Sequence, residues 1–119
     1  MNSTPAVLYI VVPCYNECEV FPTTAAELTK LVASLSEEGK ISEKSRILFI
    51  DDGSKDNTWE LIDAEYRKNK YICGLKLAGN VGHQNALFAG LMAAKDLCDI
   101  SISIDADLQD DPEAIHGFL

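Results

Sequence analysis

The stretch Ser103-Ile104-Asp105-Ala106-Asp107-Leu108-Gln109-Asp110-Asp111-Pro112 follows a run in which isoleucine occupies every second position from 100 to 104. This alternation of β-branched residues predicts a buried strand with a cluster of aspartates at its carboxyl end. Asp105 and Asp107 are two residues apart, so both side chains leave the same face while the chain stays extended. Carboxylates held this close repel each other, and a shared proton or a divalent cation relieves the repulsion. We therefore expect a cationic partner at this strand end.

Composition and charge limit the class of protein to which this stretch can belong. The 119 residues, 47% of them apolar, fit a single compact domain. The formal net charge of −9 argues against a nucleic-acid-binding surface. An acidic chain can still bind a nucleotide when a metal ion lies between the two.

Cysteine spacing and hydropathy bear on the cellular compartment. The 4 cysteines show no Cys-x-x-Cys pair and no histidines in a zinc pattern, so we expect free thiols. The apolar run 6–12 is short and lacks a preceding basic segment, unlike a secretory signal. No segment reaches the ~20 apolar residues of a membrane helix. These patterns predict a soluble, reduced domain on the cytoplasmic side.

Short apolar runs alternate with longer amphipathic segments along the chain. The continuous run 7–12, which we expect to stop at Pro13, is typical of a central parallel strand covered on both faces. Further strands are expected over 46–50, 71–77 and 100–104, and helices over 21–38, from Asp56 or Asn57 through Tyr66, and from the turn at 79–82 to Ala94. Strands that alternate with helices in this way predict an α/β domain, which is a Rossmann-like parallel sheet with helices on both faces.

Polar clusters follow each expected strand, at the edge where a sheet of this kind binds its ligands. They cover 13–17, 51–54, 80–82 and 105–107, and we expect all of them to face one crevice. The chain has no Gly-x-Gly-x-x-Gly after its first strand and no Gly-Lys-Ser/Thr, so neither a dinucleotide site nor a P-loop is supported. A metal on Asp105 and Asp107 would instead neutralise a pyrophosphate. The acidic residues of the second cluster would then accept hydrogen bonds from a base or ribose, and Tyr15 could stack on the base.

Together, four segments resemble the inverting glycosyltransferases of family 2, which have the GT-A fold. They are Val-Val-Pro-Cys-Tyr-Asn-Glu, Asp-Asp-Gly-Ser-Lys-Asp-Asn-Thr, Asn-Val-Gly-His-Gln-Asn-Ala-Leu-Phe-Ala-Gly and Asp-Ala-Asp-Leu-Gln-Asp-Asp-Pro, in order from about Val11 to Pro112. Because Leu-Gln-Asp follows Asp-x-Asp, the closest subgroup looks like the polyprenyl-phosphate glycosyltransferases, similar to dolichyl-phosphate mannose synthase. The resemblance implies that residues 1–119 are the nucleotide-sugar-binding N-terminal part of a GT-A domain, truncated at the C-terminus.

The same resemblance implies roles for residues of the first two clusters. Pro13, Tyr15 and Glu17 would line the nucleoside pocket, and Asp52 would read the base. Plainer interpretations stay open for each. Tyr15 can be a packed edge aromatic, and Glu17 can be an acid favoured by the dipole in the first turn of a helix. Asp51 and Asp52 can both be turn formers.

For the fourth cluster the resemblance implies a Mg²⁺ or Mn²⁺ site. Asp105 would lie by the ribose or the metal, Asp107 would bind the metal directly, and Gln109 would complete the shell. The alternatives are a solvated acidic strand end for the aspartates and a loop position for Gln109. In the third cluster Gly79 precedes Asn80, where the subgroup commonly has an arginine, which puts a phosphate or acceptor contact there in doubt. We interpret His83 as a polar residue at a helix start rather than a catalytic base.

The activity implied is transfer of a hexose from UDP-glucose or GDP-mannose to a polyprenyl phosphate. The general base would lie beyond Leu119, and membrane association, at the cytoplasmic face, would depend on segments absent from this chain. Two alternatives remain: a nucleotide-sugar-binding fragment without activity of its own, and a receiver-type phosphoacceptor domain. The receiver fits poorly, because the end of the first strand offers no aspartate.

Overall fold

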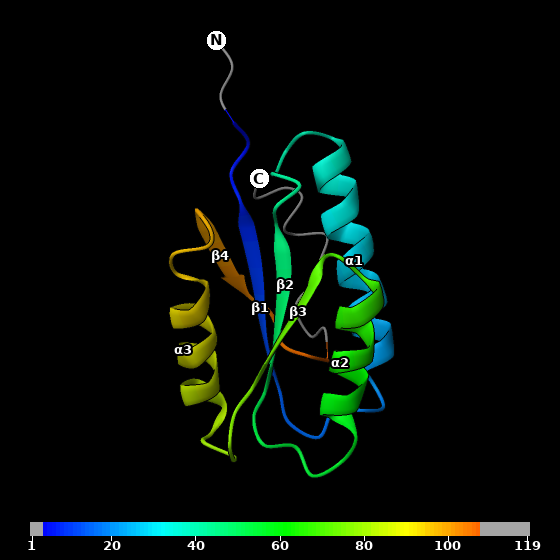
Figure 1. The fold of residues 1–119 in the computed structure, drawn as a ribbon, viewed down its shortest axis with the longest axis vertical. Helices are drawn as coiled ribbons and strands as arrows, with labels where there is room; N and C mark the ends of the chain where they lie inside the picture. The colour runs from blue at the N-terminus through cyan, green and yellow to red at the C-terminus, as the bar shows by residue number, and fades with distance from the viewer. Residues whose placement is uncertain (1–3, 108–119) are drawn as a thin grey trace.

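The computed structural model describes residues 4–107, which form a parallel sheet with helices on both faces (Figure 1). The strands are β1 (Leu8–Cys14), β2 (Arg46–Asp51), β3 (Ile72–Lys76) and β4 (Ile100–Ser103), and the helices are α1 (Phe21–Glu37), α2 (Thr58–Lys68) and α3 (His83–Ala94). The four strands lie in the order β3-β2-β1-β4, and every pairing is parallel. The predicted α/β architecture is confirmed.

β1 lies inside the sheet and is buried at all 7 of its positions. Leu8, Ile10 and Val12 enter the core that includes buried residues of α1 and α2, whereas Tyr9 and Val11 enter the core that includes those of α3. Both faces of this strand therefore require apolar side chains. This requirement explains why the run 7–12 is continuously apolar rather than alternating.

The helices divide between the two faces of the sheet. Figure 1 shows α1 and α2 on one side and α3 on the other. On the first face the rings of Phe21 and Phe49 meet edge to face, with 4.8 Å between their centroids. On the second face α3 lies very close to the sheet, because a Cβ atom added at Gly90 would stand 2.5 Å from Cδ1 of Ile50 and 2.7 Å from Cγ1 of Val11. A larger residue at Gly90 would push α3 away from the strands.

The register brings the carboxyl ends of the strands to one edge of the sheet. Cys14, the last residue of β1, pairs with Asp51, the last residue of β2, which in turn pairs with Lys76, the last residue of β3. On the other side of β1 the ladder with β4 ends where Val11 pairs with Ser103. The loops that follow the strands therefore begin close together.

The prediction that the first strand stops at Pro13 was wrong, since β1 continues to Cys14. The carbonyl of Cys14 accepts a hydrogen bond from the N–H of Asp52, on the β2 side. In an extended strand the nitrogen of the preceding residue faces the opposite side, where the β4 ladder has already ended. Proline is tolerated there because no ladder hydrogen bond needs its missing N–H. Within residues 4–107, no helix is both long and apolar enough to cross a membrane.

Candidate functional site

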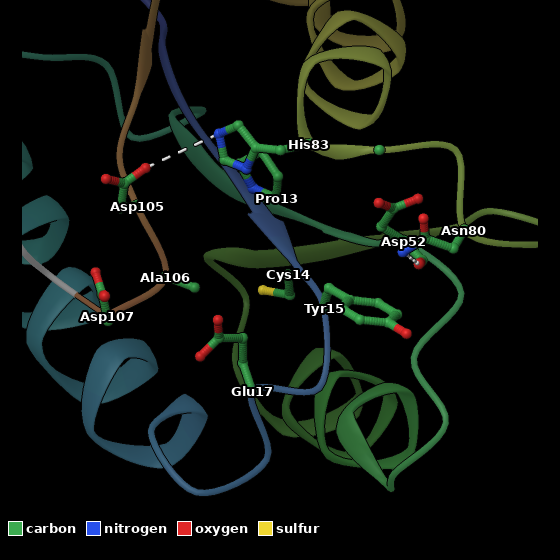
Figure 2. A pocket seen from close by; sticks show the side chains of 11 residues that line it. Pro13, Cys14, Tyr15, Glu17, Asp52, Asn80, His83, Asp105, Ala106 and Asp107 are labelled. Carbon is green, nitrogen blue, oxygen red and sulfur yellow. Dashed lines mark hydrogen bonds and ion pairs between the residues drawn. The ribbon is translucent and has the colours of Figure 1, made fainter.

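A cavity of about 430 Å³ lies beyond the carboxyl ends of the strands (Figure 2). All four polar clusters contribute to its wall, as expected for one crevice. The lining residues are Pro13, Cys14, Tyr15, Glu17, Asp52, Asn80, Gly82, His83, Asp105, Ala106 and Asp107. The structure therefore brings together the predicted site residues Pro13, Tyr15, Glu17, Asp52, Asp105 and Asp107. Asp51 is not part of the wall, and Gln109 lies outside the described residues. The roles assigned to these residues stay predictions.

The loop after β1 is fixed by hydrogen bonds to the loop after β2. Asn16 adopts a left-handed backbone conformation with φ of 53°. Its N–H donates to Oγ of Ser54 over 2.9 Å, and its side-chain Oδ1 accepts from the N–H of Lys55 over 2.8 Å. Because Asn tolerates this conformation better than most residues, the turn can present Tyr15 and Glu17, its neighbours on either side, to the cavity.

A second set of hydrogen bonds joins the same two loops at the start of α2. The N–H of Glu17 donates to Oγ1 of Thr58 over 2.9 Å, and the N–H of Cys18 donates to Oδ2 of Asp56 over 3.3 Å. Oδ1 of Asp56 accepts from both the N–H and the hydroxyl of Thr58. Asn57 occupies the N-cap position without a side-chain hydrogen bond. Asp56 is therefore the residue that accepts from an N–H of the first turn of α2, which has no partner within the helix. We call these contacts, together with those of Asn16, the loop cross-link.

Sequence reasoning missed the loop cross-link. Its side-chain members, Asn16, Ser54, Asp56 and Thr58, are short polar residues of the kind that bond to nearby main chain in turns. Here they form hydrogen bonds between two loops that are about 40 positions apart in the sequence. The local sequence pattern therefore indicates which residues form such bonds but not which partners they bind.

Asp52 is both structural and part of the cavity wall. It is 3% exposed, and its Oδ1 accepts from the N–H of Val81 over 2.7 Å. The side chain of Asn80 donates to the carbonyl of Asp52 over 3.3 Å. Gly53 has φ of 69°, and a Cβ there would stand 2.4 Å from the nitrogen of Asn80. The loop after β3 is therefore pressed against the loop after β2.

Asp51 is a turn former, which is the plainer of the two interpretations drawn from the sequence. It is 1% exposed, its Oδ1 accepts from the N–H of Ser54 over 3.2 Å, and it is not part of the cavity wall. Asp51 thus stabilises the turn after β2, and Asp52, the next residue, is part of the cavity wall. Two adjacent aspartates thus have different surroundings because strand residues alternate between faces.

The far side of the cavity carries Asp105, Ala106 and Asp107, as Figure 2 shows. The main chain is held here by the hydroxyl of Thr24 on α1, which donates to the carbonyl of Ala106. Nε2 of His83, the first residue of α3, lies 4.0 Å from Oδ1 of Asp105. His83 is at a helix start, as predicted, but it also faces an acidic residue across the cavity.

The cavity concentrates negative charge. Partial burial raises the pKa of Glu17, and the charges of Asp107 and Asp56 raise it further. Burial likewise raises the pKa of the Cys14 thiol, which donates to the carbonyl of Val12, and all four cysteines are free. A bound cation would relieve the repulsion among the carboxylates.

The oxygen ligands available here fit a hard divalent cation such as Mg²⁺ or Mn²⁺. Between residues 4 and 107, no group of three or more His, Cys, Asp or Glu side chains is placed to hold a metal by itself. Mg²⁺ usually binds through one or two carboxylates together with substrate phosphates and water, rather than in a cage made only of protein. Asp105 and Asp107 would hold the ion in this way when a phosphate ligand shares it.

Comparison with known proteins identifies the class. The model of the family described as "Glycosyl transferase family 2" matches residues 9–119. The chain therefore belongs to glycosyl transferase family 2.

Individual relatives agree with this membership. The chain is 58% identical over 119 residues to the "Uncharacterized glycosyltransferase YkoT" of Bacillus subtilis (strain 168). The match covers 100% of this chain and 35% of YkoT. Among solved structures it resembles the mannosyltransferase PcManGT from Pyrobaculum calidifontis in complex with GDP-Man and Mn²⁺, with a TM-score of 0.65 and 19% identity over 87% of this chain and 28% of that one. It also resembles S. aureus TarS in complex with UDP, with a TM-score of 0.58 and 20% identity. That match covers 85% of this chain and 27% of the TarS chain. These two likenesses show the fold.

The loop cross-link predicts a characteristic dependence of stability on pH. Burial alone would raise the pKa of Asp56, but hydrogen bonds from Thr58 and Cys18 outweigh it and lower the pKa from 3.8 to about 2. Because the folded-state value is the lower one, the stabilisation is present above about pH 4 and is lost as the pH falls through about 2. Asp56→Asn should therefore lower the free energy of unfolding by about 1 kcal/mol at pH 6, a small value for a charged hydrogen bond because the carboxylate is partly exposed.

Urea unfolding of wild type and Asp56→Asn between pH 6 and pH 2.5 measures this effect, with the exposed Asp96→Asn as the control. The gap between wild type and Asp56→Asn should shrink as the pH falls, and Asp96→Asn should show little gap at any pH. A constant gap would mean that the Asp56 charge does not hold the loops together.

Proposed function

We propose that this chain is the donor-binding part of a glycosyltransferase that takes a hexose from a nucleotide-diphosphate sugar, of the UDP-glucose or GDP-mannose type. The observation that carries the proposal is the convergence of Asp105, Asp107 and Glu17 with Tyr15 and the buried Asp52 around one cavity. Carboxylates for a metal ion, an aromatic ring and a buried acceptor are the groups that a metal-bound nucleoside diphosphate needs. Membership of family 2 points to the same class of reaction.

Each residue would have a separate task. Oδ1 of Asp52 is occupied by Val81, which leaves its Oδ2 to accept an N–H of the base. Tyr15, 40% exposed on the cavity wall, would lie against the base. Uracil and guanine both offer an N–H at the edge used for pairing, so the Asp52 contact suits either base.

A divalent cation held by Asp105 and Asp107 would supply charge neutralisation for the leaving nucleoside diphosphate. Glu17, whose pKa is raised by burial and by the charge of Asp107, would face the same ion or the sugar. PcManGT was solved with GDP-Man and Mn²⁺, and TarS with UDP, which supports a ligand of this class for a fold of this kind. The loop cross-link would keep Tyr15 and Glu17 in place before the donor binds.

Binding of nucleotides tests the donor assignment. UDP or GDP with Mn²⁺ should raise the melting temperature, because a ligand at about 100 times its dissociation constant adds about 2.7 kcal/mol of stability. Asp107→Asn should remove the part of the shift that depends on Mn²⁺. Glu19→Gln, which removes an equal charge outside the cavity wall, is the matched control and should keep the full shift. An unchanged Mn²⁺-dependent shift in Asp107→Asn would remove the basis of the proposal.

For the acceptor we propose a polyprenyl phosphate, on the resemblance carried by Leu-Gln-Asp after Asp-x-Asp. Gly79 stands where that subgroup commonly has an arginine, so a contact to the acceptor phosphate would have to come from another residue. The chain spans about a third of the length of YkoT, and we place the general base and any membrane segments in residues outside it. The full protein would then act at the cytoplasmic face of a membrane.

The acceptor can be tested with a chimera in which this chain replaces the segment of YkoT that it matches. Labelled hexose from UDP-glucose or GDP-mannose should move to the organic phase when polyprenyl phosphate is supplied, and should stay in water when the matching polyprenol without phosphate is supplied. Transfer to a water-soluble acceptor only would contradict a lipid-phosphate acceptor while leaving the donor assignment intact.

A further inference from the structure

Strand β3 lies at the edge of the sheet opposite to β4, with β2 and β1 between them (Figure 1). Among residues 4–107, β3 pairs only with β2. The carbonyl of Tyr71 and the N–H of Leu77 both form hydrogen bonds to the main chain of β2. Alternate residues of a strand direct their main-chain groups to opposite edges, so Gly74 and Lys76 direct theirs away from β2. These N–H and carbonyl groups are placed to pair with a further strand.

A groove of about 160 Å³ lies beside this open edge, between β3 and α2. It is lined by Trp59, Ile62, Asp63, Tyr66 and Gly74. The four helix residues are spaced so that they share one face of α2. Gly74 lies directly against that face, because a Cβ atom added to it would stand 2.8 Å from Cγ2 of Ile62 and 3.1 Å from Cζ3 of Trp59. We call this space the α2–β3 groove.

The α2–β3 groove is on the face where a paired strand would place a side chain. Residues directly opposite each other in paired strands have their side chains on the same face. The residue opposite Gly74 would therefore direct its side chain toward α2. The groove wall is largely apolar there: Ile62 is 0% exposed, Trp59 is half-buried, and Tyr66 is 58% exposed. The groove thus fits one apolar side chain of an added strand, which is the geometry of peptide recognition by strand addition.

The surface around this edge is basic, although the chain carries a net charge of −9. Every charged residue from 66 to 95 is Lys or Arg. Two of them, on α2, are paired with carboxylates of the same helix. Lys70 and Lys76 are exposed at the two ends of β3, where they lie over the rings of Tyr71 and Trp59. Within residues 4–107 neither lysine forms an ion pair, so acidic residues of a ligand could pair with both.

We propose that the open edge of β3 and the α2–β3 groove form a docking site for an extended acidic segment of a partner protein. The segment pairs with the main chain of Gly74 and Lys76, places one aliphatic or aromatic side chain in the groove, and directs Asp or Glu side chains toward Lys70 and Lys76. Charge complementarity favours this occupant. The site is separate from donor binding, since no residue of the groove lines the donor cavity.

Two other occupants suit the site less well. A second copy of this chain, paired edge to edge, would bring together Lys70 and Lys76 of both copies, and these like charges repel. An anionic membrane surface would attract the same lysines, but it offers no strand to pair with the main chain of Gly74. An acidic segment of a partner protein meets both requirements.

Peptide binding to the chimera with YkoT tests the proposal in a full-length protein. The probe is a displayed peptide library in which one random aliphatic or aromatic position is flanked by Asp and Glu. A second library, with Lys in place of Asp and Glu, is its control. The chimera should enrich peptides from the first library only. Enrichment from neither library, or from both equally, would overturn the proposal.

Variants of the chimera locate the bound peptide. Lys70→Glu combined with Lys76→Glu should weaken binding about tenfold, because two attractive charge contacts become repulsive. Tyr66→Ala should also weaken binding, since it removes one wall of the groove. Lys95→Glu, the same charge change at the end of α3 on the other face of the sheet, is the matched control and should bind as wild type does. Equal binding by all of these variants would contradict the site.

Amide hydrogen exchange shows whether the peptide pairs with the strand. A bound peptide should slow exchange at Gly74 and Lys76 about tenfold, because their N–H groups become hydrogen-bonded. Exchange at Leu75, whose N–H faces β2, should not change. Unchanged exchange at Gly74 and Lys76 with the peptide bound would overturn strand addition.

The same measurement identifies the other occupants. Slow exchange at Gly74 and Lys76 in the chimera without peptide would assign the edge to the protein's own chain, and its loss on dilution would assign it to a second copy. Slowing that appears only with phosphatidylcholine–phosphatidylglycerol vesicles would assign the edge to a membrane. Each of these results contradicts a partner segment.

Discussion

The structure depends first on the complete burial of β1 within a parallel sheet. A strand covered on both faces and paired on both edges lies inside the sheet, and the parallel pairing then places all four carboxyl ends at the same edge. The site is a consequence of this arrangement. Residues separated by up to about 90 positions in sequence, such as Tyr15 and Asp105, line one cavity because the strands that precede them are neighbours or nearly so.

The loops convert this proximity into a defined geometry. The loop cross-link fixes the turn after β1 to the start of α2, and the contacts of Asp52 and Gly53 fix the loop after β3. Carboxylates that repel one another are thereby held around a common space before any ligand arrives. Burial raises the pKa of Glu17, and the charge of Asp107 raises it further. Holding like charges together costs stability, and a site that binds a cation with an anionic phosphate recovers it.

Hydrophobic pattern and strand-end polarity predicted the elements, their parallel arrangement and the single crevice, because both signals are local or follow from a general rule of parallel sheets. They could not predict the strand order, the extension of β1 through Pro13, or the bonds from Asn16 to Ser54 and Lys55, since these depend on which strands become neighbours. For the same reason the sequence did not reveal that His83 faces Asp105, or that Asp52 supports the third loop while lining the cavity. Gln109 lies outside the described residues, so its place in a metal shell stays a prediction.

We propose that a divalent cation and a nucleotide share the space between the loops after β1 and β4. Paramagnetic broadening of amide signals by Mn²⁺, in the presence of UDP or GDP, measures that position directly. We expect strong broadening at Tyr15, Glu17 and Ala106, which line the cavity. We expect none at Gly39 and Ser42, which lie toward the opposite edge, where the N–H of Ser42 donates to the carbonyl of Ala6. Broadening centred away from the cavity, or of equal strength at both edges, would contradict it.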